Sequence, residues 1–305
     1  MLVTGVVLGT GLLSALLYWG YAHTFDIQVT HTRIELAGLP AEFDGYRIAL
    51  ISCIHTDSFG LRERILRDKL RGLDADLLVI AGDFRRKGCA ASDTLASCRK
   101  IFEGLSFPDG MVACKGNHDR RGMFAGLEEI GIRVLFNQCY SVHRDRLGPA
   151  EGSSTDGSEG SVALTFVGVG PARYHDPDWL AALRQARAPG LRIGLCHSPD
   201  GVVSASRHPI ALLLCGHTHG GQVCVPGLGP LVTETRLVGP EFASGLVGYE
   251  DTLVYVNRGI GWTSLPVRFR CPPEISMLTL RRVPEPVGVG PHQETAPARR
   301  DKIGS

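Results

Sequence analysis

Five short apolar segments of this chain each end in polar side chains of the kinds that bind metals or transfer protons. Apolar runs of roughly four to eight residues predict buried strands. Segments with helical spacing, such as 61–73 and 92–105, lie between them. This alternation predicts an α/β fold, in which ligands bind at the carboxyl ends of strands. The five polar clusters are Cys53-x-His55, Gly82-Asp83, Gly116-Asn117-His118-Asp119, His197 and Gly216-His217-Thr218-His219-Gly220-Gly221.

A shared metal centre accounts for the five clusters together. A single histidine at a strand end is more often a hydrogen-bonded structural residue than a ligand. Five such clusters are hard to explain by core packing, because each would carry polar atoms into a crowded, partly dry place. Imidazole suits zinc, iron and similar ions, and a carboxylate adds tolerance for manganese. His217 and His219 would point the same way from an extended segment, toward a common site.

The order of these motifs resembles that of the calcineurin-like metallophosphoesterases, in which D-x-H, GD, GNHD, H and GHxH follow one another. Three stretches are also similar to a membrane-anchored bacterial subgroup that includes YkuE-like phosphoesterases and hydrolases of UDP-diacylglucosamine. They are GHTHGGQV (216–223), YVNRGIGWTSLPVRFRCPPEISML (255–278) and IELAGLPAEFDGYRIALIS (34–52). The resemblance covers residues 28–282 and implies a four-layer α/β/β/α sandwich with two mixed β-sheets.

The resemblance also implies a role for each matching residue. Two divalent metal ions would be bound, and a metal-bound hydroxide would attack phosphorus. The ligands of the first ion would be Cys53, His55, Asp83 and His219, and those of the second Asp83, Asn117, His197 and His217. His118 would stabilise the transition state or protonate the leaving oxygen, with Asp119 orienting it. Two alternatives stay open: Asp119 caps a helix, or one histidine of GHTHGG is a hydrogen-bonding turn residue.

Cys53 departs from the family pattern, which has aspartate at this position. Three explanations compete. Cys53 is a thiolate ligand, which favours zinc or iron at the Cys53 site and leaves manganese possible at the other. Alternatively, the site is weakened and activity is reduced. Thirdly, Asp57, two residues beyond His55, replaces the missing carboxylate.

A second departure is the basic sequence that follows two of the motifs. Arg85 and Arg86 come after Gly82-Asp83, where the family usually has another acid, and Arg120 and Arg121 come after GNHD. One interpretation is solvated surface charge, the usual role of such runs. The other is a basic rim around the site that binds an anionic substrate or a phospholipid surface.

Residues Leu2 to Tyr21 carry no charge and are long enough, at about 20 residues, to cross a bilayer. No lysine or arginine precedes them, so we expect an uncleaved transmembrane helix and not a signal peptide. Arg33 and Arg47 follow the segment, which leans toward a cytoplasmic position for the domain of a single-pass cell-membrane protein. The expected domains are an anchor (1–22), a metallophosphoesterase domain (28–282) and a disordered tail (283–305).

The expected reaction is hydrolysis of a phosphoester or pyrophosphate bond. The anchor and the basic rim suggest a lipid-linked or nucleotide-sugar lipid substrate, such as UDP-2,3-diacylglucosamine, by analogy alone. The alternative is a catalytically impaired metal-binding membrane protein in which Cys53 has cost the second ion. The net charge of +1 gives no argument for a nucleic-acid partner, and nine cysteines without C-x-x-C spacing favour mostly reduced thiols.

Overall fold

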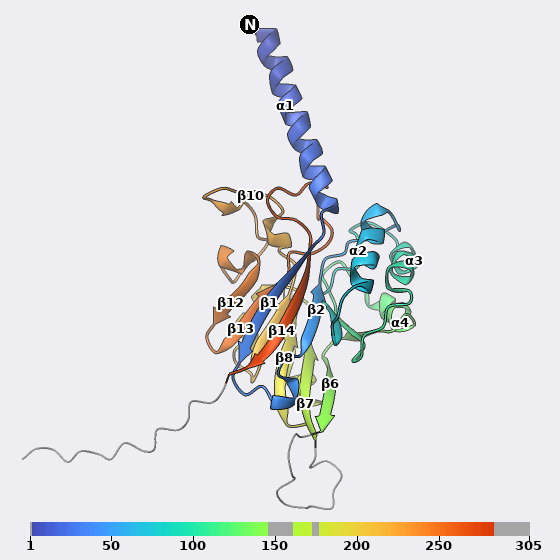
Figure 1. Ribbon diagram of the computed structural model, residues 1–305, viewed down its shortest axis with the longest axis vertical. Helices are drawn as coiled ribbons and strands as arrows, with labels where there is room; N and C mark the ends of the chain where they lie inside the picture. The colour runs from blue at the N-terminus through green and yellow to red at the C-terminus, as the bar shows by residue number, and fades with distance from the viewer. Residues whose placement is uncertain (1, 146–160, 173–176, 284–305) are drawn as a thin grey trace, which may run out of the picture.

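The computed structural model describes residues 2–145, 161–172 and 177–283, with side chains described from Gly9 onward. Two six-stranded sheets form its centre (Figure 1). In order across the first sheet, the strands are β1 (Gln28–Leu36), β14 (Glu274–Arg282), β2 (Arg47–Ile51), β3 (Leu77–Ile80), β4 (Met111–Cys114) and β5 (Ile132–Leu135). Across the second they are β12 (Gly245–Tyr249), β13 (Thr252–Val256), β9 (Leu212–Cys215), β8 (Gly190–Leu195), β7 (Ser161–Gly168) and β6 (Gln138–Asp145).

Helices and one small hairpin complete the described chain. The α-helices are α1 (Leu2–Ala22), α2 (Leu61–Arg71), α3 (Ala91–Phe102), α4 (Phe124–Glu128), α5 (Trp179–Leu183) and α6 (Val202–Ala205). Short 3₁₀ helices cover His23–Phe25, Ala41–Phe43, Arg121–Met123, Pro199–Gly201, His219–Gly221 and Pro240–Ala243. The hairpin pairs β10 (Cys224–Val225) with β11 (Gly229–Pro230). The helices predicted at 61–73 and 92–105 are present as α2 and α3, each slightly shorter at its end.

Three apolar clusters separate helices and sheets into four layers. The alternation of residues along β2 shows how: Ile48 and Leu50 point into the cluster between the two sheets. Ala49 and Ile51 point the other way, into the cluster beneath α2 and α3, which lie to one side of the first sheet in Figure 1. A third cluster, which includes Trp179, lies between the second sheet and the helices α5 and α6.

Both sheets are mixed. In the first sheet β14 runs antiparallel to β2, while β2, β3, β4 and β5 are parallel to their neighbours. In the second sheet β7, β8, β9 and β13 are parallel, and β6 and β12 are antiparallel edge strands. The α/β fold with two mixed sheets that the sequence predicts is confirmed.

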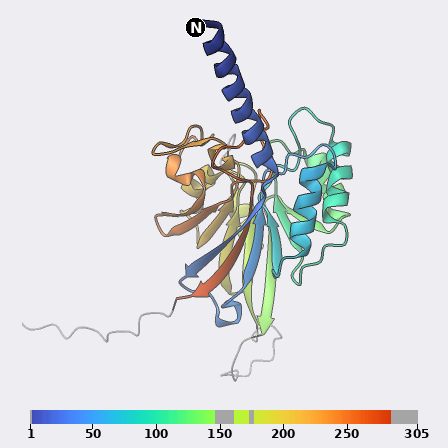
Figure 2. The ribbon, with the colours of Figure 1, turned by 45° about the horizontal axis from the view of Figure 1, so that its top comes forward.

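The N-terminal helix α1 projects away from the sheets in both ribbon views (Figure 1 and Figure 2). Over the part of the chain that the structure describes, no helix has both the length and the apolar character needed to cross a membrane. The predicted transmembrane helix is therefore not supported by the structure. The predicted disordered tail, apart from its first residue Val283, lies outside the described residues.

Candidate metal centre

The five polar clusters come together because neighbouring strands are parallel. β2, β3 and β4 pair side by side, so Cys53, Asp83 and Asn117 follow three adjacent strands of the first sheet. β8 and β9 do the same in the second sheet and are followed by His197 and His217. The carboxyl ends of parallel strands lie at the same edge of a sheet. Loops from both sheets therefore meet at one end of the sandwich.

The carboxylate of Asp83 lies among histidines that follow strands of both sheets. Its Oδ2 atom is 3.7 Å from Nε2 of His55 and 3.1 Å from Nε2 of His197. Nε2 of His55 is in turn 3.2 Å from Nε2 of His219. All four residues are buried, so their nitrogen and oxygen atoms form a cluster shielded from water. A carboxylate in this position can bridge two ions, one beside His55 and one beside His197.

Backbone contacts fix which ring nitrogens face Asp83. Nδ1 of His55 lies 3.1 Å from the carbonyl oxygen of Arg85, and Nδ1 of His197 lies 2.6 Å from that of Ala81. A carbonyl only accepts, so Nδ1 of each ring carries a proton. Nε2 of each ring therefore faces the Asp83 carboxylate, and a neutral ring offers a lone pair to a cation at this buried place.

The pKa values fit this arrangement. Burial lowers the pKa of His55 to about 4 despite the attraction of Asp83, and burial beside His55 also lowers that of His219. Both rings are therefore neutral near pH 7 and can bind a metal. Burial acts to lower the pKa of His197, but Asp83, the carbonyl of Ala81 and Asp119 together raise it above its usual value. Burial acts to raise the pKa of Asp83, and the neighbouring His197 and His55 more than reverse it, so Asp83 is ionised.

Cys53 is fully buried at the centre of this cluster. Its sulfur belongs to two groups of donor atoms that each lie within 4.8 Å of one another, Cys53-His55-His219 and Cys53-Asp83-His197. The backbone N–H of His217 donates a hydrogen bond to Sγ at 3.2 Å. Burial raises the pKa of the Cys53 thiol and Asp83 raises it further, so a thiolate here requires a cation beside it. Cys53 is the residue that the two groups share.

Asn117 and His217 complete the set predicted for the second ion. Oδ1 of Asn117 is buried and has no hydrogen-bond partner among the residues that the structure describes. Such an atom costs about 1–3 kcal/mol unless it is satisfied, and a metal ion would satisfy it. The ring of His217 packs edge-on against that of His197, with centroids 5.0 Å apart. The donors present therefore fit two ions.

The predicted ligands share an unusual backbone conformation. Five of them have positive φ angles, which non-glycine residues rarely adopt. The angles are 48° at Cys53, 45° at His55, 57° at Asp83, 71° at His217 and 53° at His219. Each residue lies two to four residues after a strand, in the loop where the chain turns toward the cluster. Backbone strain is thus concentrated at the candidate site.

Glycines in the motifs allow the loops to approach closely. A Cβ atom on Gly116 would come within 2.1 Å of Oδ1 of Asp83, and one on Gly216 within 2.3 Å of Oγ of Ser52. Real Cβ atoms do not come that close to other atoms. Glycine therefore precedes Asn117 and His217 because the neighbouring loop occupies the space of a side chain.

His118 and Asp119 have different surroundings. His118 is the more exposed, with 23% of its side chain accessible, and its Nε2 lies 4.0 Å from Oδ2 of Asp83. Asp119 is buried and accepts hydrogen bonds from the backbone N–H groups of Asp83 (2.9 Å), Gly116 (2.9 Å) and Arg85 (3.0 Å). Asp119 thus connects the loops that carry Asp83, Arg85 and Gly116. This contact differs from the two roles that the sequence suggested for Asp119, capping a helix and orienting the His118 ring.

The four arginines predicted at the rim do not share one environment. Arg85 is buried, and its guanidinium donates to the carbonyl oxygens of His118 (2.7 Å) and Cys89 (2.7 Å). Arg85 therefore supports the His118 loop through these two contacts. Arg120 is exposed. The basic rim is smaller than the sequence alone indicates.

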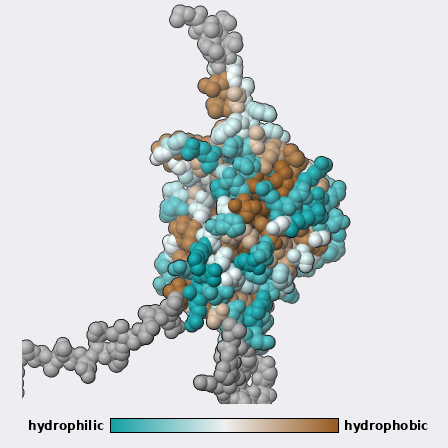
Figure 3. Space-filling view, viewed as in Figure 1, coloured by the Kyte–Doolittle hydropathy of each residue, from teal (hydrophilic) through white to brown (hydrophobic). Residues whose placement is uncertain are grey.

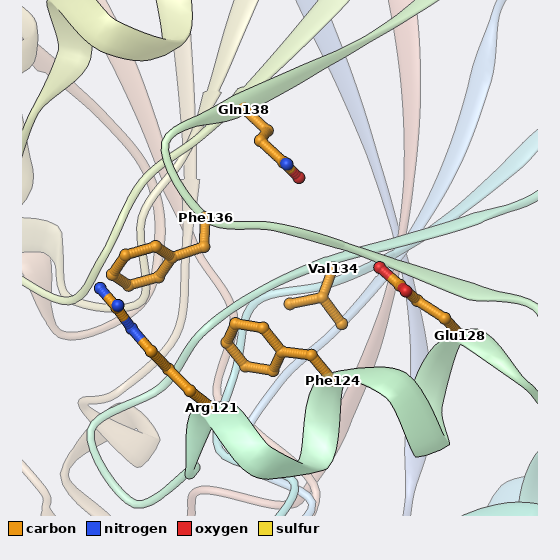
Figure 4. Close-up of a pocket in the computed structure, with 6 residues that line it drawn as sticks. All are labelled: Arg121, Phe124, Glu128, Val134, Phe136 and Gln138. Carbon is orange, nitrogen blue, oxygen red and sulfur yellow. The ribbon is translucent and has the colours of Figure 1, made fainter.

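Arg86 pairs with Asp57, Nη1 to Oδ2, at 3.1 Å. Asp57 is thereby engaged outside both groups of candidate ligands, so the structure does not bring it to the position of the missing carboxylate. Arg121 lies 4.1 Å from the centroid of the Phe136 ring. Together with Phe124 it lines a shallow pocket of about 270 Å³ (Figure 4).

Sequence reasoning missed a buried arginine beside the centre. The guanidinium of Arg268 is fully buried and donates to the carbonyl oxygens of Gly259 (3.2 Å) and Gly261 (2.6 Å). Its Nη2 lies 3.5 Å from Nδ1 of His219. The only signal in the sequence is its place in the 255–278 stretch, because nothing in the local pattern separates it from a surface arginine.

A family model and several curated relatives match this chain. Residues 46–221 match the model of the calcineurin-like phosphoesterases. The uncharacterized metallophosphoesterase YkuE of Bacillus subtilis is 30% identical, over 90% of this chain and 93% of YkuE. The UDP-2,3-diacylglucosamine pyrophosphatase LpxG of Chlamydia trachomatis is 27% identical over 89% of this chain and 95% of LpxG. The phosphodiesterase YaeI of Escherichia coli is 29% identical over 67% of this chain and 70% of YaeI.

The matched segment contains every loop that contributes to the cluster, from Cys53 to His219. Family membership and the local geometry thus point to the same place in the fold. The chain is a hydrolase and belongs to the calcineurin-like phosphoesterase family, whose members depend on two metal ions.

Proposed function

We propose that this chain hydrolyses a phosphodiester or pyrophosphate bond at a centre of two divalent metal ions. The observation that carries the proposal is the buried Asp83 carboxylate, whose Oδ2 lies 3.7 Å from Nε2 of the neutral His55 ring and 3.1 Å from Nε2 of His197. A buried carboxylate and a ring lone pair that face one another need a cation between them. When bound, two such ions supply an activated water molecule and neutralise phosphoryl charge.

The chain itself would position the ions and the substrate. The proposed ligands are Cys53, His55, Asp83 and His219 for one ion and Asp83, Asn117, His197 and His217 for the other. His118 lies at the accessible edge, and burial lowers its pKa. Its ring is therefore neutral near pH 7, and one N–H group can donate to a phosphoryl or leaving oxygen. Asp119 would keep the His118 loop in place through its backbone hydrogen bonds.

Cys53 is proposed as a thiolate ligand. Support comes from its position in both groups of donor atoms and from the backbone N–H that already donates to its sulfur. Thiolate ligands favour zinc or iron over manganese, and Zn–S bonds of about 2.3 Å are only slightly longer than Zn–O bonds. We expect zinc or iron at the Cys53 site and manganese to be tolerated at the other.

A lipid-linked or nucleotide-sugar lipid is the proposed substrate class. LpxG is named for UDP-2,3-diacylglucosamine and YaeI as a phosphodiesterase, so the relatives span pyrophosphate and phosphodiester bonds. The helix α1 presents exposed apolar side chains such as Leu12, Leu16 and Leu17, which fit attachment to a membrane. UDP-2,3-diacylglucosamine is one candidate. The side of the membrane stays a prediction.

The test uses the purified full-length chain loaded with zinc, iron or manganese. Hydrolysis of an aryl phosphodiester, an aryl phosphomonoester and UDP-2,3-diacylglucosamine is measured together with metal content by mass spectrometry. Two bound ions and turnover of a diester or pyrophosphate would support the proposal. Two bound ions without turnover of any of these substrates would contradict it.

The alternative is a metal-binding membrane protein without activity. One observation favours it: burial raises the pKa of Cys53, and a neutral thiol is a poor ligand. In that case the same measurements would find a single bound ion and no hydrolysis with any metal. The accessible His118 favours catalysis, because a protein that only binds metal does not require a histidine that can donate to a substrate.

A further inference from the structure

Five large apolar side chains protrude from two loops that adjoin the candidate metal centre. They are Leu228, Leu231, Val232 and Leu237 around the β10–β11 hairpin, and Leu265 in the loop before Arg268. We call these five residues the apolar rim. Each is between 59% and 79% exposed, whereas most large apolar residues of the domain are buried. Soluble domains rarely gather so many exposed leucines in one region without a partner.

The apolar rim is held in place by the motifs that carry the candidate ligands. Gln222, which follows GHTHGG, accepts from the backbone N–H of Thr263 at 2.8 Å and donates to the carbonyl oxygen of Leu265 at 3.3 Å. Asp200, three residues after His197, accepts from the backbone N–H of Leu237 at 2.9 Å. The rim is thus a built extension of the metal-site loops and not a set of loose loop tips.

Gly221 shows how closely the hairpin is packed on the GHTHGG motif. A Cβ atom at this position would come within 2.4 Å of Cβ of Pro230, at the end of the hairpin. The hairpin that carries part of the apolar rim therefore packs directly against the motif that supplies His217 and His219.

The same loops also hold the end of α1. The backbone N–H of Arg268 donates to the carbonyl oxygen of Gly20 at 2.9 Å. The rings of Trp19 and Phe269 lie 5.2 Å apart. Above this contact α1 exposes Leu16, Leu17 and Tyr18 along with other apolar residues. Figure 1 shows α1 leaving the domain beside β10, and Figure 3 shows brown, apolar surface on α1, separated from the domain by a paler stretch.

We propose that the apolar rim inserts into a lipid leaflet beside α1, so that the metal centre works at the membrane surface. The inference rests on the proposed function, and it assigns a specific contact surface to it. A lipid leaflet is the occupant because the rim is continuous with an exposed apolar helix. That helix carries Trp19 and two tyrosines at the level of the Phe269 loop, as residues at the headgroup level of a membrane do.

The expected consequence is that lipid substrates reach the centre without leaving the leaflet. Acyl chains would stay among the rim side chains while the phosphoryl group approaches the ions. A soluble aryl phosphodiester needs no such contact, so its hydrolysis should not depend on the rim.

The test is the quenching of tryptophan fluorescence by brominated acyl chains. The full-length chain is reconstituted with vesicles of equal parts phosphatidylcholine and phosphatidylglycerol, with or without brominated chains. Three variants are compared, Leu228→Trp, Leu265→Trp and the control Val283→Trp. Val283 follows the end of β14 that is farther from α1 (Figure 1). The strand spans about 26 Å, at about 3.3 Å for each residue, so the control position lies far from the apolar rim. The native tryptophans are common to all three.

We expect brominated vesicles to quench the tryptophans at 228 and 265 at least twofold more than the one at 283. Equal quenching at all three positions would overturn the inference, including the case in which the rim binds another protein. Hydrolysis of the soluble aryl phosphodiester by the same variants tests the proposed function separately. If the unsubstituted chain does not hydrolyse the aryl phosphodiester but the quenching pattern is as expected, the proposed function is refuted and the lipid contact is supported.

Discussion

At the scale of single residues, Cys53 stands where the motif pattern D-x-H has an aspartate. The sequence left three explanations, and the structure separates them unequally. Asp57 is paired with Arg86 and lies outside both groups of candidate ligands. Cys53 belongs to both groups. What remains is a choice between a thiolate ligand and a weakened site, and substitutions can decide it.

Replacing Cys53 tests the thiolate ligand. Cys53→Ser should lower the affinity for metal by at least the roughly 10–100-fold that the loss of a residue supporting a ligand costs, because a hydroxyl is a weaker donor than a thiolate. Cys53→Asp should keep activity and shift the preference toward manganese. Cobalt substitution gives a readout besides activity, since a thiolate–cobalt charge-transfer band in the near ultraviolet should be present in the parent and absent from both variants. If Cys53→Ser matches the parent in metal content and spectrum, Cys53 is not a ligand.

His118 should act on the substrate and not on the ions. The variant His118→Gln keeps a hydrogen-bond donor but cannot transfer a proton. We expect kcat for an aryl phosphodiester to fall by about 10²–10⁴-fold, the usual contribution of a general acid. Metal content should stay at two ions. A fall in bound metal of the same size as the fall in kcat would assign His118 to the ligands instead.

At the scale of the elements, the repeated unit is a buried strand followed by a tight, glycine-containing turn. The strand is recognisable from its apolar run, and the residue after it from its polar type. The positive φ angles of Cys53, Asp83 and His219 were not predictable, because glycine alone adopts such a conformation routinely, and the enrichment of aspartate and histidine there is too small to single out a position. The close approach of one loop to another joins segments that are distant in the sequence, so it cannot be predicted from the residue pattern of either segment.

Gly116 provides the test of this close approach. Gly116→Ala would place a Cβ atom within 2.1 Å of Oδ1 of Asp83 and must displace the loop. We expect a loss of about 1–3 kcal/mol in the free energy of unfolding, as for overpacked sites, together with weaker metal binding. Gly122→Ala is the matched control, because nothing lies within 4 Å of its Cβ position. Chemical denaturation and metal titration measure both effects, and identical curves for the two variants would exclude the steric role.

At the scale of the whole molecule, the site exists because two sheets pack face to face. Asn257, which follows β13, donates to the carbonyl oxygens of Leu50 (3.2 Å) and Glu274 (3.2 Å), so one side chain connects the second sheet to the first. Packing of the two sheets against each other also removes water from the candidate metal ligands and thereby shifts their pKa values. Stability of the metal-free protein should therefore depend on the protonation of the site.

The metal-free protein should lose stability as pH falls. The pKa of His55 is about 4 in the folded state and about 6.5 when unfolded, so between these values the unfolded chain binds more protons. Above pH 6.5 His55 does not change the free energy of unfolding with pH. Between pH 6.5 and pH 4 it lowers the free energy of unfolding by about 3 kcal/mol, at 1.36 kcal/mol per unit of pKa. His219 acts in the same direction, and His197 opposes it. Urea denaturation after chelation measures the effect.

The matched variant for this pH dependence is His55→Gln, which removes the titrating ring and keeps a polar side chain. Its free energy of unfolding should change less between pH 6.5 and pH 4 than that of the parent. Parallel pH profiles for the two proteins would show that His55 does not remain neutral in the folded state.

The sequence by itself determined the α/β class, the order of the polar clusters and the residue types that follow each strand, because these are properties of short segments. The tertiary structure decided which donors converge, since convergence depends on strand pairing and on the packing of two sheets. It placed Cys53 in both groups, turned Arg85 inward and buried Arg268 beside His219. Burial and contact between distant segments are what local periodicity does not encode.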